Sequence, residues 1–155
     1  MINAYDTEDG VVFDMSGLEC EALRSYADGL LADPAHPFVE LLRSQGLVVG
    51  DTPVPHLAAL LQAFSQATKV LTAWVVAPAG CRRSTFFVGP HSAAVLRCDD
   101  GGLYADEDDM VSVWAIDSAQ LRDTFFELSA IGEPSGEGIV PTAVPTTLFG
   151  ALERA

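Results

Sequence analysis

The sequence predicts an α+β domain with a mainly antiparallel sheet of about five strands and with helices packed on one face. Helical periodicity fills residues 16–65, and short apolar runs separated by turn residues follow from Lys69 to Ile116. An amphipathic helix at 118–130 closes the block. The connections between the apolar runs are too short for parallel crossovers, so neighbouring strands are expected to run antiparallel.

Three helices are predicted in the first half of the chain. Ser16 and Glu19 have the spacing of a capping box, so the first helix should begin after Ser16. Pro37 suits the first turn of a second, shorter helix, which Gly46 can close in the left-handed conformation. Pro55 begins the third helix. Its apolar side chains recur at i, i+3, i+4 and i+7 and are Leu57, Leu60, Leu61 and Phe64.

The strands are predicted from apolar runs bounded by Gly, Pro and Asp. The β-branched and aromatic residues 11–13 suggest an edge strand. Residues 70–77 are apolar at both parities, which is typical of a central strand covered on both faces. Further strands are expected at Thr85–Val88, Ala93–Cys98, Leu103–Ala105 and Met110–Ile116.

The aromatic residues indicate more apolar surface than a one-sided sheet can hide. The last helix begins at Asp117 or Ser118. Its inner stripe consists of Leu121, Phe125 and Leu128. Phe126 lies off that stripe, and the adjacent Phe86 and Phe87 must present their rings to opposite faces of the sheet. A second layer is therefore expected, formed either by another part of this chain or by a second copy of it.

The chain is expected to divide into three parts. Residues 1–10 are polar and predict a flexible N-terminus, and residues 11–131 predict a single α+β domain. Residues 132–155 are a Gly- and Pro-rich tail, in which an apolar stretch near Val144–Leu152 suggests a short docking helix.

Composition excludes several classes of function. The chain carries 22 acidic and 8 basic residues, a net charge of −14, which disfavours binding to nucleic acid or to an anionic membrane. No apolar run reaches the length of a membrane span, and the acidic first residues are unlike a signal peptide. Three cysteines without a CxxC pair predict reduced thiols. We therefore expect a cytoplasmic protein without membrane insertion.

No catalytic, metal or cofactor site is expected. The histidines His36, His56 and His91 are scattered, whereas a metal site needs ligands that converge. The acidic runs at 99–102 and 106–109 place carboxylates side by side, unlike the alternating ligands of a calcium loop, and predict a solvated hairpin tip.

Arg82 and Arg83 are the only adjacent cations in this acidic chain, and they fall at a predicted hairpin tip. Two guanidinium groups there could bind carboxylates of a partner. Alternatively, they could protect a hairpin edge against aggregation. Together with Phe126, they are the residues predicted to bind a partner.

The order of these segments resembles a known family. A helix (PHLAALLQAFSQATKVL) leads into a strand (TAWVVAPAG), then a hairpin (FFVGPHSAAVLRCDDGGLY), a strand (VSVWAID) and a helix (SAQLRDTFFELSAIGEPSG). With the earlier block VVFDMSGLECEALRSY, this resembles one repeat of the EspG family, the cytosolic chaperones of type VII (ESX) secretion in mycobacteria and other actinobacteria. The similarity covers roughly residues 11–135 and is one of pattern.

The resemblance implies a binding function. A member of that family resembles two such repeats joined in one chain and arranged about a pseudo-two-fold axis. Family members bind the hydrophobic helical tip of PE/PPE substrate pairs. This chain has about the length of one half, so the resemblance implies a homodimer. The resemblance assigns no binding residue.

Two main hypotheses follow. The first is a non-catalytic cytosolic chaperone or adaptor that binds a helical, PE/PPE-like or other secretion substrate as a homodimer. The alternative is a small-ligand-binding or enzymatic α+β domain, with a pocket between the sheet and the helices and with Cys81 or His91 near it. A module of another secretion or toxin system is a third possibility.

Overall fold

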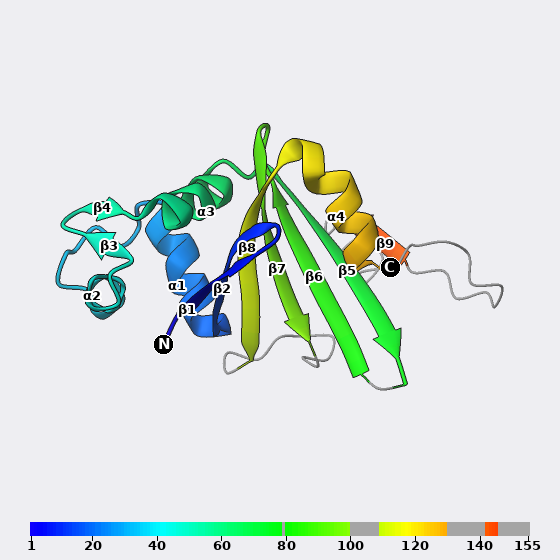
Figure 1. The fold of residues 1–155 in the computed structure, drawn as a ribbon, viewed down its shortest axis with the longest axis horizontal. Coiled ribbons are helices and arrows are strands. Elements are labelled where there is room, and N and C mark those ends of the chain that lie inside the picture. Colours follow the sequence, from blue (N-terminus) through cyan, green and yellow to red (C-terminus); the bar gives the residue numbers. More distant parts are fainter. Residues whose placement is uncertain (79, 100–108, 130–141, 146–155) are drawn as a thin grey trace, which may run out of the picture.

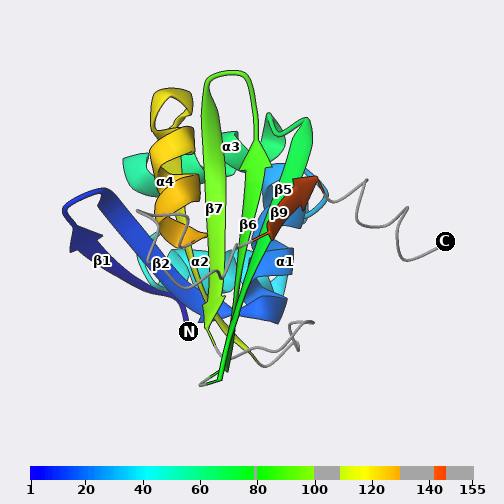
Figure 2. The same cartoon turned by 90° about the vertical axis from the view of Figure 1, so that its right-hand side faces the viewer.

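The computed structural model describes residues 1–78, 80–99 and 109–129, together with the backbone of 142–145. It contains a seven-stranded antiparallel sheet with helices on both of its faces (Figure 1, Figure 2). The predicted α+β fold is therefore confirmed. The strand order is β1-β2-β8-β7-β6-β5-β9, so the N-terminal strands lie beside the last strand of the central meander.

The elements have the following bounds. The large sheet consists of β1 (Asn3–Thr7), β2 (Gly10–Ser16), β5 (Lys69–Ala77), β6 (Gly80–Val88), β7 (Ser92–Asp99), β8 (Met110–Asp117) and β9 (Thr142–Pro145). A small separate sheet consists of β3 (Val48–Val49) and β4 (Thr52–Pro53). The helices are α1 (Gly17–Ala27), α2 (Pro37–Ser44), α3 (Pro55–Ser65) and α4 (Leu121–Leu128), the last preceded by the 3-10 turn η1 (Ser118–Gln120).

Residues 3–7 form the strand β1, in the segment 1–10 that the sequence predicts to be flexible. β1 pairs with β2 along its whole length, and Gly10 adopts a positive φ of 123° at the turn. Ile2 is buried, and its backbone N–H and carbonyl both bond the side chain of Gln45. All five side chains of β1 are exposed, so the strand leaves no alternating pattern in the sequence.

The helix boundaries follow the predicted signals. The Ser16 hydroxyl accepts a hydrogen bond from the Glu19 N–H at 3.1 Å, and the Glu19 carboxylate accepts one from the Ser16 N–H at 2.8 Å, which completes the capping box. Pro37 occupies the first turn of α2, and Gly46 follows that helix with φ of 71°. Asp117 forms a second capping box ahead of α4.

The strands β5 to β8 form an antiparallel meander, as predicted, but β6 is longer than expected. It begins at Gly80 rather than at Thr85. Residues 81–84 contain no apolar run, and they join the sheet because β5 and β7 both extend far enough to pair with them. Arg82, for example, lies opposite Val75 on one side and Asp99 on the other.

Helices cover both faces of the sheet, so the prediction that they pack on one face is wrong for α4. Helices α1 and α3 lie on one face, and α4 lies on the other (Figure 2). The adjacent rings of Phe86 and Phe87 explain this arrangement, because they point to opposite faces. Phe87 contacts Phe64 of α3, and Phe86 contacts Phe125 of α4, each with ring centroids 5.3 Å apart. The second layer comes from this same chain.

Two predictions concern residues that the structure describes only in part. The strand Leu103–Ala105 and most of the tail 132–155 lie outside the described residues. The described piece of the tail is β9, which pairs with β5, so the predicted docking helix does not begin at Val144. None of the described helices has both the length and the apolar character needed to cross a membrane.

Candidate functional site

Helix α4 covers its face of the sheet only in part. The buried side chains there are Phe86, Ala93, Val95, Ile116 and Leu128. Around them lie apolar side chains that remain partly exposed, namely Leu71, Val88, Trp114, Leu121 and Phe125. The opposite face, beneath α1 and α3, holds the larger core cluster. The α4 face therefore keeps some accessible apolar surface.

A groove of about 520 Å³ lies on this face between α4 and the β1–β2 hairpin. Trp114 and Ile116 of β8 form its floor, Tyr5 and Val12 line the hairpin side, and Leu128 lines the α4 side. Three exposed carboxylates also line it, those of Asp9, Asp123 and Glu127. The groove thus combines an apolar, aromatic floor with acidic walls.

The hairpin side of the groove is held by a small polar network. The Asp14 carboxylate accepts a hydrogen bond from the Ser112 hydroxyl at 2.6 Å and one from the Tyr5 hydroxyl at 3.3 Å. Ser112 belongs to β8, whereas the other two residues belong to the hairpin. The network therefore ties the hairpin to the floor of the groove and restrains the ring of Tyr5.

The electrostatics of the groove are acidic. Arg97 is the only cation among the described residues that line it. The guanidinium of Arg97 lies 3.3 Å from the Asp99 carboxylate, which it shares with Arg82, so its charge is partly compensated within the chain. An occupant of the groove must therefore carry apolar surface and, at its flanks, positive charge.

Phe126, one of the predicted partner-binding residues, lies on α4 but does not line the groove. As predicted, it lies off the inner stripe and is 37% exposed. Its ring contacts Phe125 with centroids 6.2 Å apart, and the Arg122 guanidinium lies 5.6 Å from the ring centroid. Phe126 thus offers a separate aromatic contact beside a cation.

Arg82, the second predicted residue, lies within β6 and not at a hairpin tip. Its Nε lies 2.8 Å from the Asp99 carboxylate, which also contacts Arg97. The alternation of side chains along β6 puts Arg82 on the α4 face with Phe86. Arg82 is therefore engaged in an exposed ion pair between the neighbouring strands β6 and β7, a pairing that the sequence alone does not reveal.

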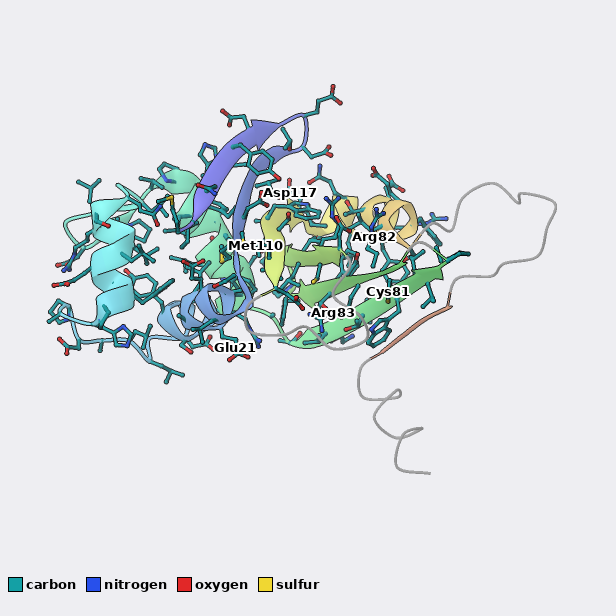
Figure 3. All side chains as sticks on the ribbon, turned by 90° about the horizontal axis from the view of Figure 1, so that it is seen from below. Glu21, Cys81, Arg82, Arg83, Met110 and Asp117 are labelled. Carbon is teal, nitrogen blue, oxygen red and sulfur yellow. The ribbon has the colours of Figure 1, made fainter. Side chains whose placement is uncertain are left out.

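Arg83, the third predicted residue, points to the opposite face. It lines a second cavity, of about 320 Å³, between α1 and the strands β6, β7 and β8. Figure 3 shows Arg83 on the side nearer Glu21 and α1, and Arg82 on the side nearer α4. The structure therefore does not bring Arg82, Arg83 and Phe126 together into one site.

Cys81 and His91, named for the alternative hypothesis, lie at opposite ends of the β6–β7 hairpin. Cys81 is partly exposed near the start of β6. His91 follows β6 and lines a third cavity, of about 410 Å³, near Asp117 and Gln66. They do not share a site.

Within the described ranges, no three His, Cys, Asp or Glu side chains gather closely enough to hold a metal ion. The acidic segments considered for calcium lie mostly outside those ranges, because residues 100–108 are not described.

Sequence reasoning missed most of the groove. Tyr5 and Asp9 lie in a segment that was predicted to be flexible. The sequence does predict that Trp114 lies on the same face of its strand as Ser112 and Ile116, because side chains alternate along a strand. It does not predict which face of the sheet remains partly uncovered by helices.

Comparison of the chain with protein-family models, with curated proteins and with solved structures finds no match.

Proposed function

We propose that this chain is a non-catalytic chaperone or adaptor of the EspG-like type, which binds an apolar helical segment of a secretion substrate in the groove between α4 and the β1–β2 hairpin. The observation that supports this proposal is the groove itself, with the partly exposed Trp114 in its apolar floor and its acidic walls. Helices commonly bind proteins by placing an apolar face in such a groove.

The groove lies between α4 and the β1–β2 hairpin, an arrangement into which the apolar face of a partner helix fits. It runs beside α4, an eight-residue helix that spans about 12 Å. A partner helix of about two turns can therefore place two or three apolar side chains over Trp114 and Ile116. Lysine or arginine residues at the flanks of that helix would face Asp123 and Glu127.

A fluorescence titration tests this function. The chain has two tryptophans, so the Trp74→Phe variant leaves Trp114 in the groove floor as the sole indole reporter. The probe is an amphipathic helical peptide with a leucine face flanked by lysines. The control peptide has the same composition in scrambled order. We expect only the amphipathic peptide to shift the Trp114 emission to shorter wavelength, because only it can cover the indole with a continuous apolar face.

A matched pair of charge reversals locates the binding surface. Glu127→Lys changes a groove carboxylate, and Glu40→Lys makes the same change on the exposed surface of α2. We expect Glu127→Lys to weaken peptide binding several-fold and Glu40→Lys to leave it unchanged. Equal responses to the two peptides, or equal effects of the two variants, would contradict the proposal.

The predicted contact of Phe126 is tested in the same titration. Because Phe126 lies outside the groove, Phe126→Ala weakens binding only if the partner extends over α4. Val49→Ala is the matched control, because Val49 is an exposed apolar residue on the distant β3.

Two further expectations stay predictions. Light scattering at two protein concentrations that differ tenfold tests the homodimer, and a monomer mass at both would contradict it. Co-expression with a PE/PPE-like pair tests the substrate class, because a stable complex forms only if the chain recognises such a pair. Cytoplasmic localisation belongs to the same proposal.

The alternative, a small-ligand-binding domain, is supported by one specific observation. The cavity beneath α1 lies between a helix and the sheet, as that hypothesis expects, and it contains Arg83.

A further inference from the structure

The cavity beneath α1 is separate from the groove and lies on the other face of the sheet. Its mouth is formed by Leu18, Glu21 and Arg24, which are exposed on α1. Its interior is formed by Phe87 and Arg83 on β6, with further apolar side chains from β7 and β8. Its volume of about 320 Å³ falls at the lower end of the range for small-molecule sites.

Arg83 is a partly buried cation whose Nε finds no hydrogen-bond acceptor among the described residues. Its Nε is shielded from solvent and donates no hydrogen bond. The chain has 22 acidic residues, and Arg82, the neighbour of Arg83, is paired with Asp99. A shielded guanidinium donor without an acceptor is costly, and an incoming carboxylate would remove that cost.

Arg24 supplies a second guanidinium at the same cavity. Its guanidinium carbon lies 4.5 Å from the centroid of the Phe87 ring, in a cation–π contact. Within the described part of the chain, Arg24 makes no ion pair with a carboxylate. The stacking holds its planar group over the ring while the N–H donors at its edge remain available.

We propose that this cavity binds a small organic monocarboxylate with an apolar body. The carboxylate lies between Arg83 and Arg24, which can offer it bidentate donors, and the apolar body lies against Phe87 and its neighbours. Glu21 at the mouth and the net charge of −14 disfavour dianions such as phosphate esters. The site is independent of peptide binding in the groove.

Calorimetric titration of the full chain tests this proposal. The probes are 3-phenylpropanoate and 4-methylpentanoate, and the control is 3-phenylpropanamide, which has a similar shape but no charge. We expect both acids to bind and the amide to bind at least about tenfold more weakly, because charge-assisted hydrogen bonds are stronger than neutral ones.

Three methionine variants separate the site from general effects of charge. Arg83→Met should weaken binding of the acids by about tenfold or more, and Arg24→Met by a smaller factor, because Arg24 is exposed. Arg122→Met removes the same charge on the opposite face and should leave binding unchanged. Thermal unfolding of Arg83→Met should stay at or above the wild-type temperature, since the variant removes an unpaired buried donor.

Three results would overturn the proposal: no binding of either acid at millimolar concentration, equal binding of acid and amide, or acid binding that survives Arg83→Met. If Arg83→Met fails to fold, Arg24→Met on the exposed face of α1 replaces it in the test. Acid binding that is unchanged in Arg24→Met would then overturn the proposal. None of these results bears on the groove, whose test uses Trp114 and Glu127.

Discussion

Cys20 is expected to make the stability of this protein fall at alkaline pH. Burial raises the pKa of the Cys20 thiol from 9.0 to about 12, because the thiolate would lose its hydration. The nearby Arg24 partly opposes that rise, and Glu21 adds a little to it. Cys20 is 2% exposed and belongs to the main core cluster, so it loses nearly all of its contact with water on folding.

The sign and size of the effect follow from linkage. Between pH 9 and about 12, the thiol is ionised in the unfolded chain but neutral in the folded chain. The unfolded state therefore binds fewer protons, and the free energy of unfolding falls as pH rises. The contribution is complete below pH 9 and is lost at about 1.4 kcal/mol per pH unit above it.

Urea unfolding of the wild type and of Cys20→Ala between about pH 8 and pH 11 measures this slope. The variant is less stable at neutral pH because it leaves a cavity, but its stability should fall less steeply with pH. Leu23→Ala is the matched control: Leu23 is fully buried on the same helix and does not titrate, so its slope should equal that of the wild type. Parallel curves for the wild type and Cys20→Ala would refute the reasoning.

Two further predictions concern stability. Gly89→Ala should destabilise the protein by about 1–3 kcal/mol, because the added Cβ would lie 2.9 Å from the backbone oxygen of Gln66, and thermal unfolding measures the loss. Ser16→Ala should cost about 1 kcal/mol by removing the capping box of α1, whereas Ser44→Ala, at the last turn of α2, should cost less; chemical denaturation of both variants compares them.

Local structure was predictable where the signal is carried by neighbouring residues. The periodicity of α3, the Ser16–Glu19 pair and the position of Gly46 all act within a few residues, and each lies where the sequence predicts it. β1 was missed because its register depends on β2 and on a contact between Ile2 and Gln45, 43 residues apart. The periodicity of apolar residues in a sequence does not predict a contact between residues so far apart along the chain.

The candidate site was harder to predict than the fold. The groove joins residues from β1, β2, β7, β8, η1 and α4, and the pairing of β2 with β8 brings the hairpin to the other segments. The two arginines were noticed as a pair, yet adjacent residues on a strand point to opposite faces. Recognising β6 as a strand at Arg82 and Arg83 would have separated them, and the polar stretch 81–84 hid that strand.

The order of strands in the sheet has a consequence for folding kinetics. Each of the strands β5 to β8 pairs with a strand that is its neighbour along the chain. The pairing of β2 with β8 instead closes a long loop, because the hydrogen bond between Ser112 and Asp14 links residues 98 positions apart. Closing that loop carries the larger entropic cost, so this β2–β8 junction should form late.

Because the groove has one wall on the hairpin and its floor on β8, it exists only after the β2–β8 junction closes. Stopped-flow refolding of Trp74→Phe should therefore show the Trp114 signal in the slowest phase, and its completion in an early phase would contradict this order. A nascent chain would complete this groove only at the last step of folding.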